Sequence, residues 1–148
     1  MPINTFRGLM ADGAIDTITL HTNDGSIGYR IVKFEVMTGD IPGSIESVSL
    51  LAVWKVPQTV VAETVDFADP TLLAAVDYRQ HDNEAYGIVG NEIIFDSEIF
   101  NQDIYLTHTD TNSSLPCNYY LELEQIKLDL NENTVATLKD IRNETLTV

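Results

Sequence analysis

The sequence predicts an all-β protein, an antiparallel β-sandwich of jelly-roll type with a short C-terminal α-helix. Apolar and polar residues alternate through several segments, which is the pattern of half-buried strands. Clusters of Gly, Pro, Asn and Asp separate these segments, and helical periodicity occurs only near the C-terminus. About seven expected strands favour a sandwich, with an open barrel as the alternative architecture.

The length is typical of one domain. With 148 residues the chain can bury a full hydrophobic core, and its 44% hydrophobic residues are ordinary for a folded protein. No internal repeat or linker divides it. We expect an N-terminal arm over residues 1–13, the β-sandwich over 14–128, and a helix with a polar tail over 129–148.

The first strands are expected to form a hairpin. Residues 14–22 (AIDTITLHT) are rich in β-branched side chains and end in the turn cluster NDGS, residues 23–26. Residues 27–37 alternate, and strict alternation puts Val32 and Phe34 on the same face. The two segments would pair across the turn.

The central segments continue the strand pattern. Residues 45–56 are apolar on both faces at their centre, which is typical of a central strand. A further strand is expected over 59–67, and Asp69 before Pro70 predicts a short helical turn over 69–75. Shorter strands are expected over 76–78, 85–89 and 92–95.

The C-terminal part contains two strands and a helix. Residues 103–108 and 119–124 alternate, the second with Tyr120, Glu122 and Glu124 opposite Tyr119, Leu121 and Leu123. Residues 131–143 begin with a capping Asn and carry an apolar stripe at helical spacing, formed by Val135, Leu138 and Ile141. This helix would pack on its own domain or dock onto a neighbouring subunit.

The charge narrows the range of partners. There are 23 acidic and 8 basic residues, for a net charge of -15, which disfavours nucleic acid and anionic membranes. No apolar run of about 18 residues and no signal-peptide pattern is present, so synthesis in the cytoplasm is expected. The single cysteine, Cys117, offers no internal disulfide.

No residue pattern predicts an enzyme. Cys117 would need a histidine base, but the spacing of the three histidines selects none of them, and their positions at strand ends suggest solvent-facing sites for His21 and His108. HExxH and GxSxG patterns are absent. Glu122 and Glu124 could lie about 7 Å apart on one strand face, but a solvated sheet face explains them better. We predict no catalytic residue and no cofactor.

Calcium is the one metal ion that the sequence brings into consideration. Asp110 and Asn112 lie two residues apart in a polar loop and could both supply oxygen ligands. The full twelve-residue EF-hand pattern is missing, so these two residues are candidates only and no metal site is otherwise predicted.

Aromatic and apolar residues supply the candidates for an interface. Aromatic side chains on a sheet face can form a subunit contact or stack against sugars. With the helical stripe they predict a homo-oligomer. The candidate interface residues are Trp54, Tyr105, Tyr120, Val135, Leu138 and Ile141.

Several phrases resemble small virion structural proteins of marine tailed phages. They are TLHTNDGSIGYRIVKFEVM (19–37), DPTLLAA (69–75), EIIFDSEIFNQDIYLTHTDT (92–111) and CNYYLELEQ (117–125), and the likeness covers about residues 14–128. The resemblance implies a structural role in a virion, as a capsid decoration or cement protein or a head–tail component. It implies the major capsid protein or another virion protein as partner, and it assigns no functional residues.

The acidic charge favours the exterior of the capsid over contact with the packaged DNA. Two other classes remain open. A tail component that binds glycans or a receptor would have a groove lined by Tyr and by Asp or Asn. A hydrolase would have two convergent carboxylates in a deep pocket.

Overall fold

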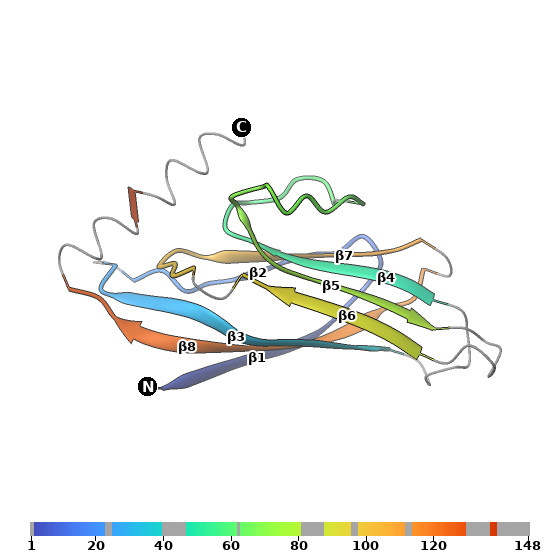
Figure 1. Ribbon diagram of the computed structural model, residues 1–148, viewed down its shortest axis with the longest axis horizontal. Coiled ribbons are helices and arrows are strands. Elements are labelled where there is room, and N and C mark those ends of the chain that lie inside the picture. Colours follow the sequence, from blue (N-terminus) through green and yellow to red (C-terminus); the bar gives the residue numbers. More distant parts are fainter. Residues whose placement is uncertain are drawn as a thin grey trace.

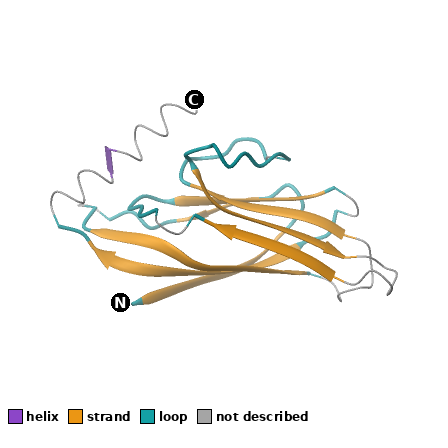
Figure 2. Cartoon of the chain, in the orientation of Figure 1, coloured by secondary structure: helices purple, strands orange, loops and turns teal. Residues whose placement is uncertain are grey.

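Two antiparallel β-sheets face each other in the computed structural model, which describes residues 2–22, 25–39, 47–61, 63–80, 88–95, 98–111, 114–129 and 137–138 (Figures 1 and 2). The predicted β-sandwich is therefore confirmed. The strands are β1 (Ile3–Met10), β2 (Ile15–Ile18), β3 (Ile27–Thr38), β4 (Ser47–Trp54), β5 (Leu72–Gln80), β6 (Ile88–Ile94), β7 (Ile104–Asp110) and β8 (Cys117–Lys127).

The strand order resembles that of a jelly roll, with β6 joined to the other sheet. A small sheet has the order β1-β8-β3 and a large sheet the order β2-β7-β4-β5-β6. The pairs are nested, because β1 pairs with β8, β2 with β7 and β4 with β5. The remaining nested pair, β3 and β6, is in contact without a hydrogen-bonded ladder, and β6 instead pairs with β5. Folding such a nested set of pairs over on itself gives two Greek keys in two sheets.

The core lies between the sheets and is formed by alternate residues of both. On β8, Leu121 and Leu123 point inward and are fully buried, and Ile104 and Leu106 do the same on β7. Phe34 meets them from β3. Each strand thus places one of its two faces in the core, as its period-2 pattern predicts.

A β-bulge corrects the predicted faces of β3. The register against β8 shifts between Ile31 and Lys33, so Val32 is the extra residue. Ile31 and Phe34 are both buried, whereas Val32 is 40% exposed. Strict alternation put Val32 and Phe34 on one face, and this was wrong because the bulge changes the phase of the strand.

Two predictions at the N-terminal end were also wrong. The expected hairpin does not form, because β2 pairs with β7 in the large sheet and β3 with β8 in the small sheet. Residues 1–13 are not an arm outside the sandwich, since β1 pairs with β8 along its whole length. The chain passes from the large sheet to the small sheet between β2 and β3 instead of turning back within one sheet.

The connection between β4 and β5 differs from the sequence prediction as well. Apart from residue 62, which is not described, the segment 59–67 is irregular, so no strand forms there. The expected helical turn over 69–75 is a tight turn. Within it the Asp69 carboxylate accepts hydrogen bonds from the Thr71 backbone N–H at 2.8 Å and the Thr71 hydroxyl at 2.6 Å, and β5 starts at Leu72.

Of the predicted C-terminal helix, the structure describes only residues 137–138, and these are helical. Leu138 is 61% exposed. Val135 and Ile141 lie outside the described residues.

Two contacts join the crossing segments to the sheets. Tyr29 and Phe100 exchange backbone hydrogen bonds of 2.7 and 3.0 Å, and their rings stack with centroids 6.4 Å apart. Asp103 Oδ1 accepts hydrogen bonds from the backbone N–H groups of Leu20 and His21, at 2.8 and 3.0 Å, and lies 2.7 Å from His21 Nδ1. Burial acts to raise the pKa of Asp103, but these hydrogen bonds outweigh it and hold the pKa below its ordinary value.

We predict that Asp103→Asn lowers the free energy of unfolding at pH 7 by about 1–2 kcal/mol, because hydrogen bonds to a charged acceptor are lost. A carboxyl whose pKa is lowered by folding stabilises the protein above its unfolded-state pKa and loses that effect as the pH falls through its folded-state pKa. The difference between variant and parent should therefore begin to shrink below about pH 4 and be smaller at pH 3 than at pH 7. Urea unfolding at pH 7 and pH 3 measures it. Glu63→Gln, at an exposed carboxylate, is the control, and a constant difference at both pH values would contradict the assignment.

Candidate interaction surface

The outer face of the small sheet is formed by four rows of side chains that cross its three strands. In β1 the odd-numbered residues point outward, in β8 the even-numbered ones, and β3 follows after its bulge. From β1 through β8 to β3, the rows are Ile3–Glu124–Arg30, Thr5–Glu122–Lys33, Arg7–Tyr120–Glu35 and Leu9–Asn118–Met37. We call this set of side chains the small-sheet face.

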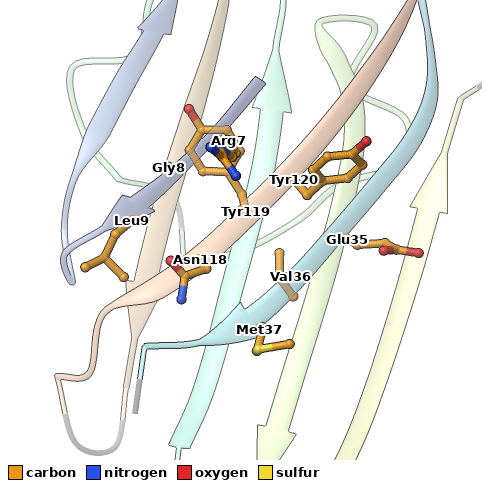
Figure 3. A pocket seen from close by; sticks show the side chains of 9 residues that line it. All are labelled: Arg7, Gly8, Leu9, Glu35, Val36, Met37, Asn118, Tyr119 and Tyr120. Carbon is orange, nitrogen blue, oxygen red and sulfur yellow. The ribbon is translucent and has the colours of Figure 1, made fainter. Parts of the chain in front are cut away.

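A groove of about 520 Å³ crosses the small-sheet face between its last two rows. Figure 3 shows the residues that line it, on the three neighbouring strands. Arg7, Tyr120 and Glu35 form one wall, and Leu9, Asn118 and Met37 form the other. Between the walls, the intervening residues point their side chains into the sandwich, so the floor is main chain.

Gly8 leaves room for a close contact on the inner side of this floor. A Cβ at Gly8 would lie 3.0 Å from a ring carbon of Tyr119, its partner on β8. The Tyr119 ring therefore packs flat over Gly8, and Tyr119 is only 8% exposed. Burial raises the pKa of Tyr119, and the nearby Asp16 raises it further. The phenol stays neutral and acts as part of the core.

The small-sheet face is balanced in charge although the protein is strongly acidic. Its rows contain three basic side chains (Arg7, Arg30 and Lys33) and three acidic ones (Glu35, Glu122 and Glu124). Arg30 forms an ion pair with Glu124, and Lys33 Nζ lies 3.7 Å from Glu35 Oε1. The net charge of the whole chain is -15. An acidic partner is therefore repelled less here than at other faces.

One end of the small-sheet face is apolar. Leu9 is 59% and Met37 60% exposed, and both are in the same row. Tyr120 in the neighbouring row is half-buried and adds an aromatic ring. An aromatic and apolar centre with charged side chains around it is the composition of a protein interface.

The predicted carboxylate pair lies on this face. Glu122 and Glu124 both point outward, as their alternation indicated. Each has a basic neighbour in its row, Lys33 for Glu122 and Arg30 for Glu124. This fits the interpretation of the two glutamates as charge on a solvated sheet face.

The outer face of the large sheet is covered by the chain itself around Trp54, whereas Val48 and Ile93 on the same face are partly exposed. Trp54 is 5% exposed and packs with Ala52 and Leu72 in a second apolar cluster, beneath residues of the β4–β5 connection such as Val65. Figure 1 shows this connection lying over the large sheet. Trp54 Nε1 donates a 3.0 Å hydrogen bond to the Thr107 hydroxyl. Trp54 is therefore not available to a partner, which corrects its prediction as an interface residue.

The other interface candidates have different positions. Tyr105 is half-buried against the Trp54 cluster, on the face opposite Tyr120. Leu138 is exposed. Of the four candidates in the described part of the chain, Tyr120 alone lies on the small-sheet face, and Val135 and Ile141 lie outside that part.

The calcium candidate Asp110 is used within the fold. It is 5% exposed; its Oδ2 accepts a 3.0 Å hydrogen bond from the Leu115 N–H, and its Oδ1 a 3.5 Å one from the Val48 N–H. Asn112 lies outside the described residues. In the described part of the chain, no three His, Cys, Asp or Glu side chains come together in a way that could hold a metal ion.

His108 and Cys117 lie in the interior. His108 is fully buried, so the prediction of a solvent-facing site was wrong for it, whereas His21 is exposed. His108 Nδ1 lies 3.0 Å from the carbonyl of Ala11, which can only accept, so the proton is on Nδ1. Its Nε2 is buried and has no hydrogen-bond partner among the described residues.

No protein-family model matches this chain, and no curated protein matches it. Within the described residues, no helical stretch has the length and apolar character needed to span a bilayer.

Sequence reasoning found Tyr120 on the small-sheet face but missed Arg7, Leu9, Glu35 and Met37. The signal for Glu35 and Met37 was the alternation of residues 27–37, which the bulge obscured. For Arg7 and Leu9, the alternation within β1 is hard to see because both of its faces carry apolar residues.

We predict that Cys117 resists alkylation in the native protein. It is 1% exposed, and burial, with Asp110 as a second cause, raises its pKa to about 12. At pH 8 only about one thiol in ten thousand would then be the reactive thiolate. Mass spectrometry of the Val60→Cys variant after iodoacetamide treatment measures this, because position 60 is exposed. One adduct is expected in buffer and two in denaturant, whereas two adducts formed equally fast in buffer would contradict the prediction.

Proposed function

We propose that this protein is a non-enzymatic virion structural protein of a tailed phage, and that it acts as a decoration or cement protein on the outside of the capsid. The observation that carries the proposal is the small-sheet face, which is exposed, locally balanced in charge and apolar at one end. The major capsid protein, or another protein of the shell, would be the partner. The resemblance of residues 14–128 to virion proteins of marine tailed phages supports the same assignment.

The size of the face fits a contact that works in many copies. An eight-residue strand and three-strand width correspond to roughly 25 Å by 15 Å, or about 400 Å² per copy. A standard interface buries about 800 Å² per partner, so a single contact would be weak. Repetition over a symmetric shell, with copies linked to each other, would turn weak contacts into stable attachment.

The charge distribution also fits an exterior position. A chain with a net charge of -15 would be repelled by packaged DNA. The small-sheet face has equal numbers of acidic and basic side chains. Through this face the protein could contact a shell with acidic surface groups with the least electrostatic repulsion. Jelly-roll sandwiches occur in viral capsid proteins but also in lectins, so the fold alone does not decide between these functions.

Binding to purified particles tests the proposal. Particles of the phage that encodes this chain, stripped of it and mixed with purified protein, should recover it in many copies and resist heat better. Met37→Asp should weaken attachment about tenfold or more, because a charge replaces an exposed methionine at the apolar end of the face. Val60→Asp changes an apolar residue that is 75% exposed on the opposite side of the sandwich, and it should bind as the parent does. Absence from particles, or a handful of copies confined to the tail, would overturn the proposal.

The groove supports glycan binding as a second candidate function. It brings the Tyr120 ring beside the Asn118 amide and the Glu35 carboxylate, a set that can stack against a sugar and bind its hydroxyl groups. A glycan array with the parent protein tests it. Binding that is lost in Tyr120→Phe, which keeps the ring, or in Asn118→Ala would support a polar sugar site. No binding to any glycan would exclude this function for the groove.

A further inference from the structure

The strand β1 has one edge that no other strand covers in the described part of the chain. It pairs with β8 on its inner edge and is the last strand of the small sheet on the other (Figure 1). A free strand edge presents unpaired N–H and C=O groups that can pair with another chain.

The other sheet edges are shorter, interrupted or already in contact. At the far side of the small sheet, β3 has the bulge at Val32 and a bridge from Tyr29 to Phe100. In the large sheet, β2 is four residues long and β6 is in contact with β3. In contrast, β1 runs for eight residues without a register shift or an internal proline, and Arg7 is its one charged residue. It lacks the features with which edge strands usually resist pairing.

The main-chain groups at this free edge can be assigned to particular residues. The Gln125 N–H donates a 2.9 Å hydrogen bond to the Pro2 carbonyl, which marks this pair as hydrogen-bonded. Because hydrogen-bonded and non-hydrogen-bonded pairs alternate in an antiparallel ladder, even-numbered residues of β1 bond to β8. The N–H and C=O groups of the odd-numbered residues, Ile3 to Leu9, therefore point to the free edge.

We propose that β1 pairs antiparallel with β1 of a second copy of this chain, across a two-fold axis at Phe6. Thr5 then lies opposite Arg7 of the second copy, and Ile3 lies opposite its Leu9, with the symmetric pairs repeated. These four pairs use the outward-pointing groups and would make about eight main-chain hydrogen bonds, two for each pair. The small sheets of the two copies become one continuous sheet.

The side chains select this register. Ile3 and Leu9 are 48% and 59% exposed in one copy, and the pairing brings them together on the outer face. Phe6, packed at the margin of the core, would meet its own copy in the non-hydrogen-bonded pair, where side chains are closest. Arg7 meets the neutral Thr5.

Other registers fit less well. A two-fold axis at Arg7 would oppose two like charges, which is destabilising in a cross-strand pair. An axis at Thr5 would place Leu9 beyond the end of the partner's strand. A shift by one residue would oppose outward-pointing groups with groups already bonded to β8, and it would turn the side chains to the wrong faces.

The charges of β1 allow a second copy of this chain to pair at its free edge. Two molecules with a net charge of -15 repel each other, but β1 carries no acidic side chain and one arginine. The strand is also self-complementary, because its exposed apolar residues lie at equal distances from Phe6. The pairing does not rest on the proposed function. If both hold, it would double the small-sheet face and provide the link between copies on a particle.

Sedimentation equilibrium over a concentration series tests the pairing. The 16.5 kDa chain should approach twice that mass as concentration rises, and Leu9→Lys should raise the dissociation constant tenfold or more. Met37→Lys is the matched control, since Met37 is 60% exposed in the same row but on β3; it should dimerise as the parent does. A parent chain that stays monomeric up to about 1 mM would overturn the proposal, as would equal loss of dimer in both variants, which would indicate contact through the small-sheet face.

A cross-link tests the register. Phe6→Cys should form a disulfide-linked dimer on mild oxidation, because the two positions face each other across the axis at a separation that a disulfide can bridge. Asn4→Cys is on the same side of β1 but would lie opposite Gly8 of the second copy, so it should cross-link poorly. Equal cross-linking of both variants, or cross-linking of Asn4→Cys alone, would overturn the register. Failure of particle binding with dimerisation intact would overturn the proposed function and leave the pairing standing.

Discussion

The double pairing of β8 is the constraint on which the small sheet depends. This strand hydrogen-bonds to β1 on one edge and to β3 on the other, so its register fixes the position of both neighbours. Its inward leucines, Leu121 and Leu123, are fully buried, and its outward glutamates would occupy the core if the register slipped by one residue. Burial of two leucines contributes about 3–6 kcal/mol, and burial of two carboxylates without partners would cost more than that. The same energetic difference that holds the fold in register therefore also places Tyr120 between Arg7 and Glu35.

The two outer faces of the sandwich differ in how far the chain covers them. The β4–β5 connection lies over the large sheet and carries Val65 onto the Trp54 cluster, while the rings of Phe67 and Phe95 meet edge to face with centroids 5.4 Å apart. Lys55 leads into this connection, and its buried ammonium pairs with Glu98. An apolar part of a sheet needs a cover, and here the chain supplies one for the part around Trp54. The small sheet has no such cover in the described residues, and its outer rows are correspondingly more polar.

Much of the fold could be predicted from local pattern, but pairing between distant segments could not. Alternation located the strands around residues 103–108 and 119–124, because each puts apolar side chains on one face. It missed β1, whose Ile3 and Leu9 are apolar on the outside while Phe6 and Met10 are apolar on the inside. The partner of β1 is more than a hundred residues away, at Cys117–Lys127, and no short-range signal links the two. Nested long-range pairs of this kind carry a loop-closure cost that local sequence does not reveal.

In the candidate site, too, local pattern could be predicted and contacts between distant segments could not. Tyr120 was found because its strand alternates cleanly, whereas Trp54 was misjudged because a connection that looked like a strand folds back over it. His108 was misjudged because the chain at Ala11 closes over the strand end. In each case the residue type shows which interactions the side chain can make. Packing between distant segments decides whether the side chain is exposed to a partner. In this fold the strands β1 and β8, from opposite ends of the chain, are neighbours in one sheet. The side chains exposed on the outer face of that sheet therefore come from both strands, and neither strand's sequence alone predicts the face.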